Sequence, residues 1–212
     1  MSGCVNSMSE KDSEEINVIN QNFVELMGTG WYYEPLPIPP MPLAKNSTKE
    51  DSIRFNNEII ESQFRLNNRK LDTSELQVFL FDTLVTYKGD REFESILSPE
   101  NFENNFPVDT SWIKLIGKLN QIEKTKKLDL TEINQIGKYT LVSYQEFKDT
   151  TGTKRKIGTL VFSSVAFDKN KTRGVFYYSF VCGGLCGGGS IVFVEKIDDK
   201  WQIIGQREMW VS

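Results

Sequence analysis

The chain has 212 residues, of which 39% are hydrophobic and 25% are charged, and its formal net charge is −4. This composition suits one folded domain with a hydrophobic core and differs from that of disordered or fibrous proteins. The negative charge makes nucleic acid a poor partner. The chain has no histidine, which excludes hydrolases with an imidazole base and histidine-ligated zinc sites. We therefore expect neither a metal nor a cofactor.

The first residues bear on the location of the protein. Met1-Ser-Gly-Cys4 and the polar run to Glu14 resemble the cleavage end of a bacterial lipoprotein signal, whose cysteine becomes the lipidated first residue. The charged and apolar parts of such a signal are missing, so Met1 would be a start codon added to a mature chain. The resemblance implies a lipid anchor on Cys4, a disordered tether over residues 1–14 and an envelope location, periplasmic or surface-exposed. The alternative is an ordinary disordered terminus on a cytoplasmic protein.

Residues 15–48 predict a helix followed by a proline-rich strap. Apolar residues recur at spacings of three and four up to Met27, and Gly28 can end that helix. Five prolines between Pro35 and Pro42 enforce an extended, polyproline-like segment. This segment either binds a groove of a partner or lies across its own domain, and the aromatic residues beside it favour the second interpretation.

Residues 49–212 predict a single α+β domain. Its clearest helix begins near Thr110, where Trp112 belongs to an apolar stripe that must cover a sheet. The other elements before residue 138 are a helix from about Lys49 to Asn68, a strand from Leu76 to Thr86, a short helix capped by Ser98 and a helical turn from Thr131.

The carboxyl half predicts an antiparallel meander in a curved sheet of five or six strands. The short connections between its strands are suited to hairpins. A two-residue turn at Asp198-Asp199 would place Trp201 opposite Lys196. Both faces of this hairpin are apolar, which predicts a helix on one face and the amino-terminal strap on the other. The predicted strands are 138–147, 157–167, 172–181, 191–197 and 200–208.

Several carboxyl-terminal motifs resemble a group of uncharacterised bacterial proteins, many of them predicted to be exported or lipoproteins. These motifs are the run from Gly158 to Asp168, Cys182-Gly-Gly-Leu-Cys-Gly-Gly-Gly189, Lys200-Trp-Gln-Ile203 and Trp210-Val-Ser212. The resemblance covers roughly the last 55 residues and implies no known activity. The helix-covered curved sheet is also similar, at the level of fold alone, to nuclear-transport-factor-2-like and cystatin-like proteins.

Cys182 and Cys186 flank a predicted hairpin tip. Glycines between and after them allow the Cα separation that a disulfide needs. The pair is either a disulfide, two buried thiols or a redox pair, and outside the cytoplasm the disulfide is favoured. The sequence provides no helix terminus or basic neighbour that would lower a thiol pKa. The glycine loop leads into a strand, which argues against a phosphate-binding loop.

Carboxylates could support glycoside hydrolysis without histidine. Glu146, Asp149, Glu195 and Glu208 are candidates, but nothing in their spacing selects a pair. We therefore expect a non-catalytic binding or interaction module, anchored to a membrane through Cys4, with an unidentified protein or small-molecule partner. The alternative is a carboxylate-dependent hydrolase that uses the concave sheet face. A pocket with two carboxylates of raised pKa would favour the hydrolase, and an exposed aromatic patch near Trp31 or Trp210 would favour partner binding.

Overall fold

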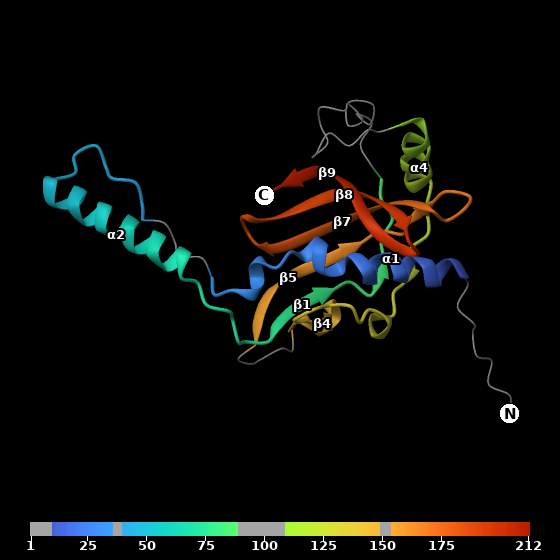
Figure 1. Ribbon diagram of the computed structural model, residues 1–212, viewed down its shortest axis with the longest axis horizontal. Helices are drawn as coiled ribbons and strands as arrows, with labels where there is room; N and C mark the ends of the chain where they lie inside the picture. The colour runs from blue at the N-terminus through green and yellow to red at the C-terminus, as the bar shows by residue number, and fades with distance from the viewer. Residues whose placement is uncertain (1–9, 36–39, 89–108, 149–153) are drawn as a thin grey trace. The chain divides into compact units, whose positions relative to one another are not determined.

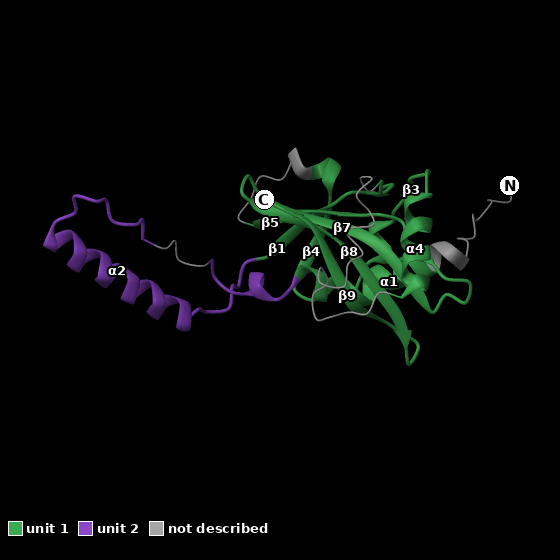
Figure 2. Cartoon of the chain, turned by 90° about the horizontal axis from the view of Figure 1, so that it is seen from above, with its two compact units in different colours: residues 1–27, 75–212 green, residues 28–74 purple. Residues whose placement is uncertain are grey.

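The computed structural model describes residues 10–35, 40–88, 109–148 and 154–212 (Figure 1). The chain forms two compact units, one of residues 28–74 and the other of residues 1–27 with 75–212 (Figure 2). These boundaries differ from the predicted division at residues 14 and 48. Cys4, Asp149 and the helix expected at Ser98 lie outside the described residues.

The larger unit has the predicted α+β architecture, with helices against an open sheet of seven strands (Figure 1). The sheet is mixed, and its carboxyl-terminal strands form the antiparallel run that the sequence predicts. Along the sheet the strands are β4 (Tyr139–Ser143), β1 (Leu76–Leu80), β5 (Arg155–Phe162), β7 (Arg173–Gly183), β8 (Cys186–Ile197) and β9 (Lys200–Val211), and β6 (Ala166–Phe167) also pairs with β7.

The meander prediction is wrong at its first connection. Strand β1 pairs in parallel with both β4 and β5, so it separates the two strands that were expected to form a hairpin. All five residues of β1 are buried, which is typical of a parallel strand inside a sheet. The predicted strand from Leu76 to Thr86 is also interrupted, because Thr83–Leu84 forms a separate strand, β2, that pairs with β3 (Lys126–Lys127).

Helices cover both faces of the sheet. Helix α4 (Thr110–Asn120) buries Trp112, Leu115, Ile116 and Leu119 against sheet residues that include Phe193, which confirms the predicted stripe. Helix α1 (Glu10–Met27) packs against β9 (Figure 1). There the Gln21 side chain accepts a hydrogen bond from the Trp201 backbone amide. The apolar side chains of Val18, Ile19 and Phe23 on α1 are fully buried, and the predicted strap belongs to the other unit.

The last hairpin forms as predicted. Asp198 and Asp199 both adopt positive φ, at 49° and 61°, as a type I′ turn requires. This turn places Trp201 directly opposite Lys196. The buried Trp201 ring packs beside Phe167, with 5.5 Å between the ring centroids.

The smaller unit consists of the short 3-10 helix η1 (Gly30–Tyr32), the segments beside it and helix α2 (Lys49–Asn67). Thr48 and Asp51 form a reciprocal capping box at the start of α2, so the predicted helix is confirmed.

The larger unit also contains two 3-10 helices, η4 (Leu130–Glu132) and η5 (Tyr144–Lys148). Helix η4 takes the place of the helical turn predicted from Thr131.

Candidate functional site

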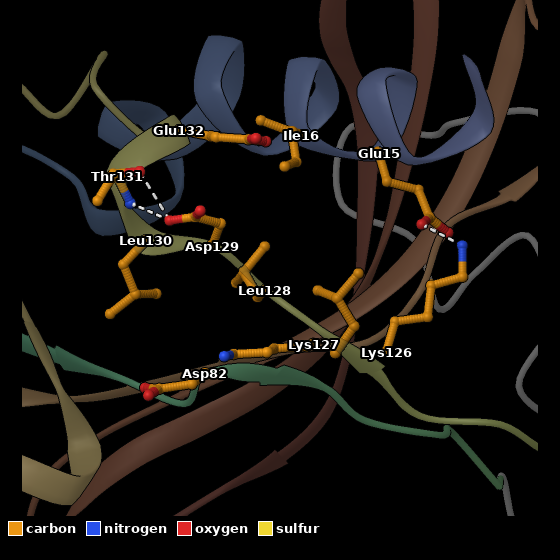
Figure 3. Close-up of a pocket in the computed structure, with 11 residues that line it drawn as sticks. Glu15, Ile16, Asp82, Lys126, Lys127, Leu128, Asp129, Leu130, Thr131 and Glu132 are labelled. Atoms are coloured by element: carbon orange, nitrogen blue, oxygen red, sulfur yellow. Dashed lines mark hydrogen bonds and ion pairs between the residues drawn. The ribbon is translucent and has the colours of Figure 1, made fainter. Parts of the chain in front are cut away.

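A pocket of about 840 Å³ lies beside α1 in the larger unit (Figure 3). Its walls come from the first half of α1, the β2–β3 ribbon and η4. The residues that line it are Glu15, Ile16, Asp82, Leu84, Lys126, Lys127, Leu128, Asp129, Leu130, Thr131 and Glu132.

The β2–β3 ribbon sets the direction of the two lysines. Neighbouring residues of a strand project to opposite sides, and Figure 3 shows Lys126 extending toward Glu15 while Lys127 extends toward Asp82. The Leu128 amide donates to the Asp82 carbonyl oxygen at 2.8 Å, which extends the ribbon by one bond. The pairing of Thr83 with Lys127 and of Leu84 with Lys126 fixes both lysines in the ribbon.

Helix α1 holds the wall formed by η4 and the ribbon at two points. Glu15, only 1% exposed, accepts from Lys126 Nζ at 2.7 Å and from the Val165 amide at 3.1 Å. A buried carboxylate is tolerated only with such partners. One turn further on, the Asn20 side chain donates to the Glu132 carbonyl oxygen at 2.7 Å and accepts from the Asn134 amide at 2.8 Å. The wall is therefore fixed to α1 by polar contacts.

Three further carboxylates line the pocket. Asp129 accepts hydrogen bonds from the hydroxyl and the backbone amide of Thr131, at 2.7 and 3.0 Å, and these bonds lower the pKa of its carboxyl group. Asp82 accepts from the Ser143 hydroxyl at 2.8 Å. For the Glu132 carboxylate, no hydrogen bond or ion pair is found with any residue in the described part of the chain.

The lining combines negative charge with aliphatic surface. Glu15 and Lys126 neutralise each other, which leaves the carboxylates of Asp82, Asp129 and Glu132 with one ammonium group, that of Lys127. Four aliphatic side chains contribute apolar wall, namely Ile16, Leu84, Leu128 and Leu130. Such a pocket is suited to a ligand with a cationic group attached to an apolar body.

A second hollow, of about 410 Å³, lies beside α4 and has the opposite charge. Two of its four cations already have partners, because Lys118 Nζ donates to the Phe167 carbonyl oxygen at 2.6 Å and Arg173 forms an ion pair with Glu195 at 3.1 Å. The residues that line it are Ser111, Lys114, Leu115, Lys118, Phe167, Asp168, Lys169 and Arg173.

The predicted cysteine pair lies at the tip of the β7–β8 hairpin. The sulfur atoms of Cys182 and Cys186 are at disulfide-bonding distance, and their Cα atoms are 5.1 Å apart. The glycines after Cys186 belong to β8 rather than to a loop. Trp210 is 37% exposed over this strand, and its Nε1 donates to the Tyr177 hydroxyl at 2.8 Å. Trp210 therefore lies at the surface, at one of the two positions where an exposed aromatic patch would favour partner binding.

The carboxylates proposed from the sequence are not brought together. Glu146 lies on η5, Glu195 pairs with Arg173, and the exposed Glu208 lies opposite Ser190 on β8. None of these three lines either pocket. The sequence did not single out four pocket carboxylates, namely Glu15, Asp82, Asp129 and Glu132. Among them, only Asp129 had a local signal, because an aspartate two residues before a threonine is typical of a helix cap.

Two further features of the described residues bear on the kind of site. They contain no group of three or more cysteine, aspartate or glutamate side chains that could hold a metal ion. None of the helices in the described ranges has the length and apolar character of a membrane-spanning segment.

The chain matches no protein-family model, no curated protein and no solved structure.

Proposed function

We propose that this chain is a non-catalytic binding module whose ligand carries an amine or guanidine group on an apolar body. The observation that carries the proposal is the pocket beside α1, where three carboxylates and one ammonium group remain after Glu15 pairs with Lys126. Cationic groups of a ligand would lie beside the carboxylates of Asp82, Asp129 or Glu132 and gain charge-assisted hydrogen bonds. The aliphatic side chains would contact the apolar part of the ligand.

The ionisation of Asp129 supports binding rather than acid catalysis. Thr131 lowers the pKa of Asp129 through two hydrogen bonds, so this carboxyl group is charged at neutral pH and cannot act as a general acid. A charged carboxylate is what a cationic ligand requires. We expect binding to weaken once the pH falls far enough to protonate Asp129, below the usual range of an aspartate because its pKa is lowered.

Spermidine is a suitable probe, because it combines several amines with methylene groups. We expect it to raise the melting temperature of the protein, and we expect Glu132→Gln to reduce that rise, since the substitution removes a charge without changing the size of the side chain. Glu146→Gln is the matched control, because Glu146 is exposed and lies outside the pocket. An equal rise in both variants, or no rise at all, would contradict the proposal.

A carboxylate-dependent hydrolase is the second candidate, favoured by the presence of Asp82, Asp129 and Glu132 in one pocket. Such an enzyme needs one carboxyl group with a raised pKa as its acid. Hydrolysis of nitrophenyl glycosides that is lost in both Asp82→Asn and Glu132→Gln would favour this candidate over simple binding.

We further propose that the protein is held at a bacterial membrane by a lipid on Cys4 and is related to the exported proteins that its carboxyl-terminal motifs resemble. The support is the sequence Met1-Ser-Gly-Cys4 and the polar residues after it. A bacterium fed an alkyne-bearing fatty acid should label the protein expressed from its natural gene. Labelling that persists after Cys4→Ser would contradict the anchor.

A further inference from the structure

The unit of residues 28–74 has no hydrophobic core. None of its described residues is buried, whereas the core of the described chain lies entirely in the other unit. Its main element, α2, exposes large apolar side chains, with Ile53 54%, Ile60 65% and Phe64 66% exposed. In proteins, most of the stability of a helix comes from the packing of its apolar face. The exposed side chains of α2 therefore require a surface to cover them.

Three exposed apolar residues of α2 form a defined stripe, while its other apolar residues, Phe55, Ile59 and Leu66, lie on the opposite side of the helix. At about 100° per residue, Ile53, Ile60 and Phe64 fall within about 40° of one another around the helix axis. Their spacings of seven and four match those of helices that pack along a common seam. Asn56 and Asn57 flank the stripe with uncharged amides. We call the surface formed by Ile53, Ile60 and Phe64 the α2 stripe.

Most charged residues of α2 lie away from the stripe and pair with one another, whereas Lys49 and Glu50 in the first turn lie nearer to it. Arg54 lies 3.4 Å from Asp51 and 3.8 Å from Glu58, and Arg65 forms an ion pair with Glu61. These paired residues centre roughly 120° from the α2 stripe. The stripe therefore carries no net charge that would repel an identical surface.

The ends of α2 are complementary in charge. Its first turn carries Lys49, Glu50 and Asp51, with a net charge of −1, and its last turn carries Arg65. When two copies of such a helix lie antiparallel, the acidic first turn of one lies beside the basic last turn of the other. The two helix dipoles then also oppose each other, which is the favourable arrangement. A parallel pair would place like charges together at both ends.

We propose that the chain self-associates through the α2 stripes of two copies, packed antiparallel about a twofold axis. Placing that axis between residues 58 and 59 sets Ile53 of one copy opposite Phe64 of the other, and Ile60 opposite Asn57. Both copies use the same surface, as a closed dimer requires. This interface is distinct from the ligand pocket, because every residue that lines the pocket belongs to the other unit.

Sedimentation of the full chain over a range of concentrations tests the interface. We expect the purified protein to be dimeric at about 100 µM and Phe64→Glu to raise the dimer dissociation constant at least about tenfold, because the twofold axis buries the new charge twice. Glu58→Gln is the matched control on the charged face and should leave the dimer unchanged. Since Phe64 is exposed, an unchanged thermal melt should show that the Phe64→Glu variant still folds.

Cross-linking tests the antiparallel orientation. In a Cys4→Ser background, Asn57→Cys should give a disulfide-linked dimer on oxidation, because position 57 lies close to the twofold axis. Ile53→Cys should not, since the two copies of residue 53 lie far apart in an antiparallel pair. A monomer at all concentrations, as would result if the stripe bound another protein or its own chain, would overturn the proposal. So would a dimer that Phe64→Glu leaves intact or that Ile53→Cys cross-links.

Discussion

At the scale of single residues, Gly189 explains part of the glycine run after Cys186. A Cβ atom at this position would overlap Trp210 Nε1 and the Tyr177 hydroxyl group, which form a hydrogen bond across the strand. The aromatic pair therefore requires a residue without a side chain beneath it. Gly189 thus allows the Trp210 and Tyr177 side chains to approach the backbone of β8 closely.

We expect Gly189→Ala to destabilise the protein by about 1 to 3 kcal/mol, because the Trp210 or the Tyr177 side chain must move. Urea denaturation followed by tryptophan fluorescence would measure the change. Gly184→Ala is the control, since no atom lies within 4 Å of the position that its Cβ would occupy. Equal effects at the two positions would mean that the aromatic pair does not depend on Gly189.

The cysteine pair at the hairpin tip gives a second prediction at this scale. With Cα atoms 5.1 Å apart, Cys182 and Cys186 lie within the range for an unstrained disulfide. We expect the mass of the purified protein to rise by about 2 Da on reduction, since each disulfide takes up two hydrogen atoms. Alkylation of both cysteines without reductant, under oxidising conditions, would contradict this expectation.

At the scale of elements, α4 is the helix whose apolar stripe was clearest in the sequence. Asp109 caps it by accepting hydrogen bonds from the Ser111 and Trp112 amides at 2.7 and 3.2 Å. The stripe of α4 is buried, yet its exposed interior contains Gly117. Glycine weakens a helix because the unfolded chain has more backbone freedom to lose.

We expect Gly117→Ala to stabilise the protein by about 0.5 to 1 kcal/mol, as measured by a higher denaturation midpoint. No atom lies within 4 Å of the new methyl group, so the propensity gain is not offset by a clash. The same substitution at Gly158 should destabilise, because its Cβ would lie 2.5 Å from the Val181 carbonyl oxygen. A loss of stability at Gly117 would mean that α4 does not behave as an ordinary exposed helix at this position.

At the scale of the whole molecule, the larger unit depends on charged carboxylates that join distant segments. Burial by itself raises the pKa of Glu14, but the hydrogen bonds from Trp201 and Lys196 outweigh this effect, so the pKa is lowered. The hydrogen bond from Lys154 lowers the pKa of Glu75. Hydrogen bonds from Ser111 are the main cause of the lowered pKa of Asp109, which reaches a distant segment through its ion pair with Arg173. These contacts stabilise the fold only while the carboxyl groups are ionised.

We expect the free energy of unfolding to fall on acidification. A group with a lower pKa in the folded state stabilises the protein above its unfolded pKa, and this stabilisation is lost as the pH falls through the folded pKa. Stability should therefore be steady near neutrality and decrease below the ordinary glutamate pKa of 4.5. Denaturation at a series of pH values would measure the decrease, which should be smaller in Glu14→Gln than in the control Glu208→Gln.

The sequence by itself determined the elements whose signals are local. The Asp198-Asp199 turn fixed the register that places Trp201 opposite Lys196, the stripe at Trp112 identified α4, and the cysteines at the hairpin tip were close enough to pair. Each of these depends on residues near one another in the chain. Turn geometry and helical periodicity are therefore sufficient to predict them.

Only the tertiary structure decided which distant segments meet. Strand β1 lies between β4 and β5 because its wholly buried residues need a neighbour on each side, and no local pattern specifies which strands these are. The pocket likewise depends on the ion pair of Glu15 with Lys126, which are 111 residues apart. Such contacts form because packing brings buried polar groups to partners, and a linear pattern of residues does not contain that information.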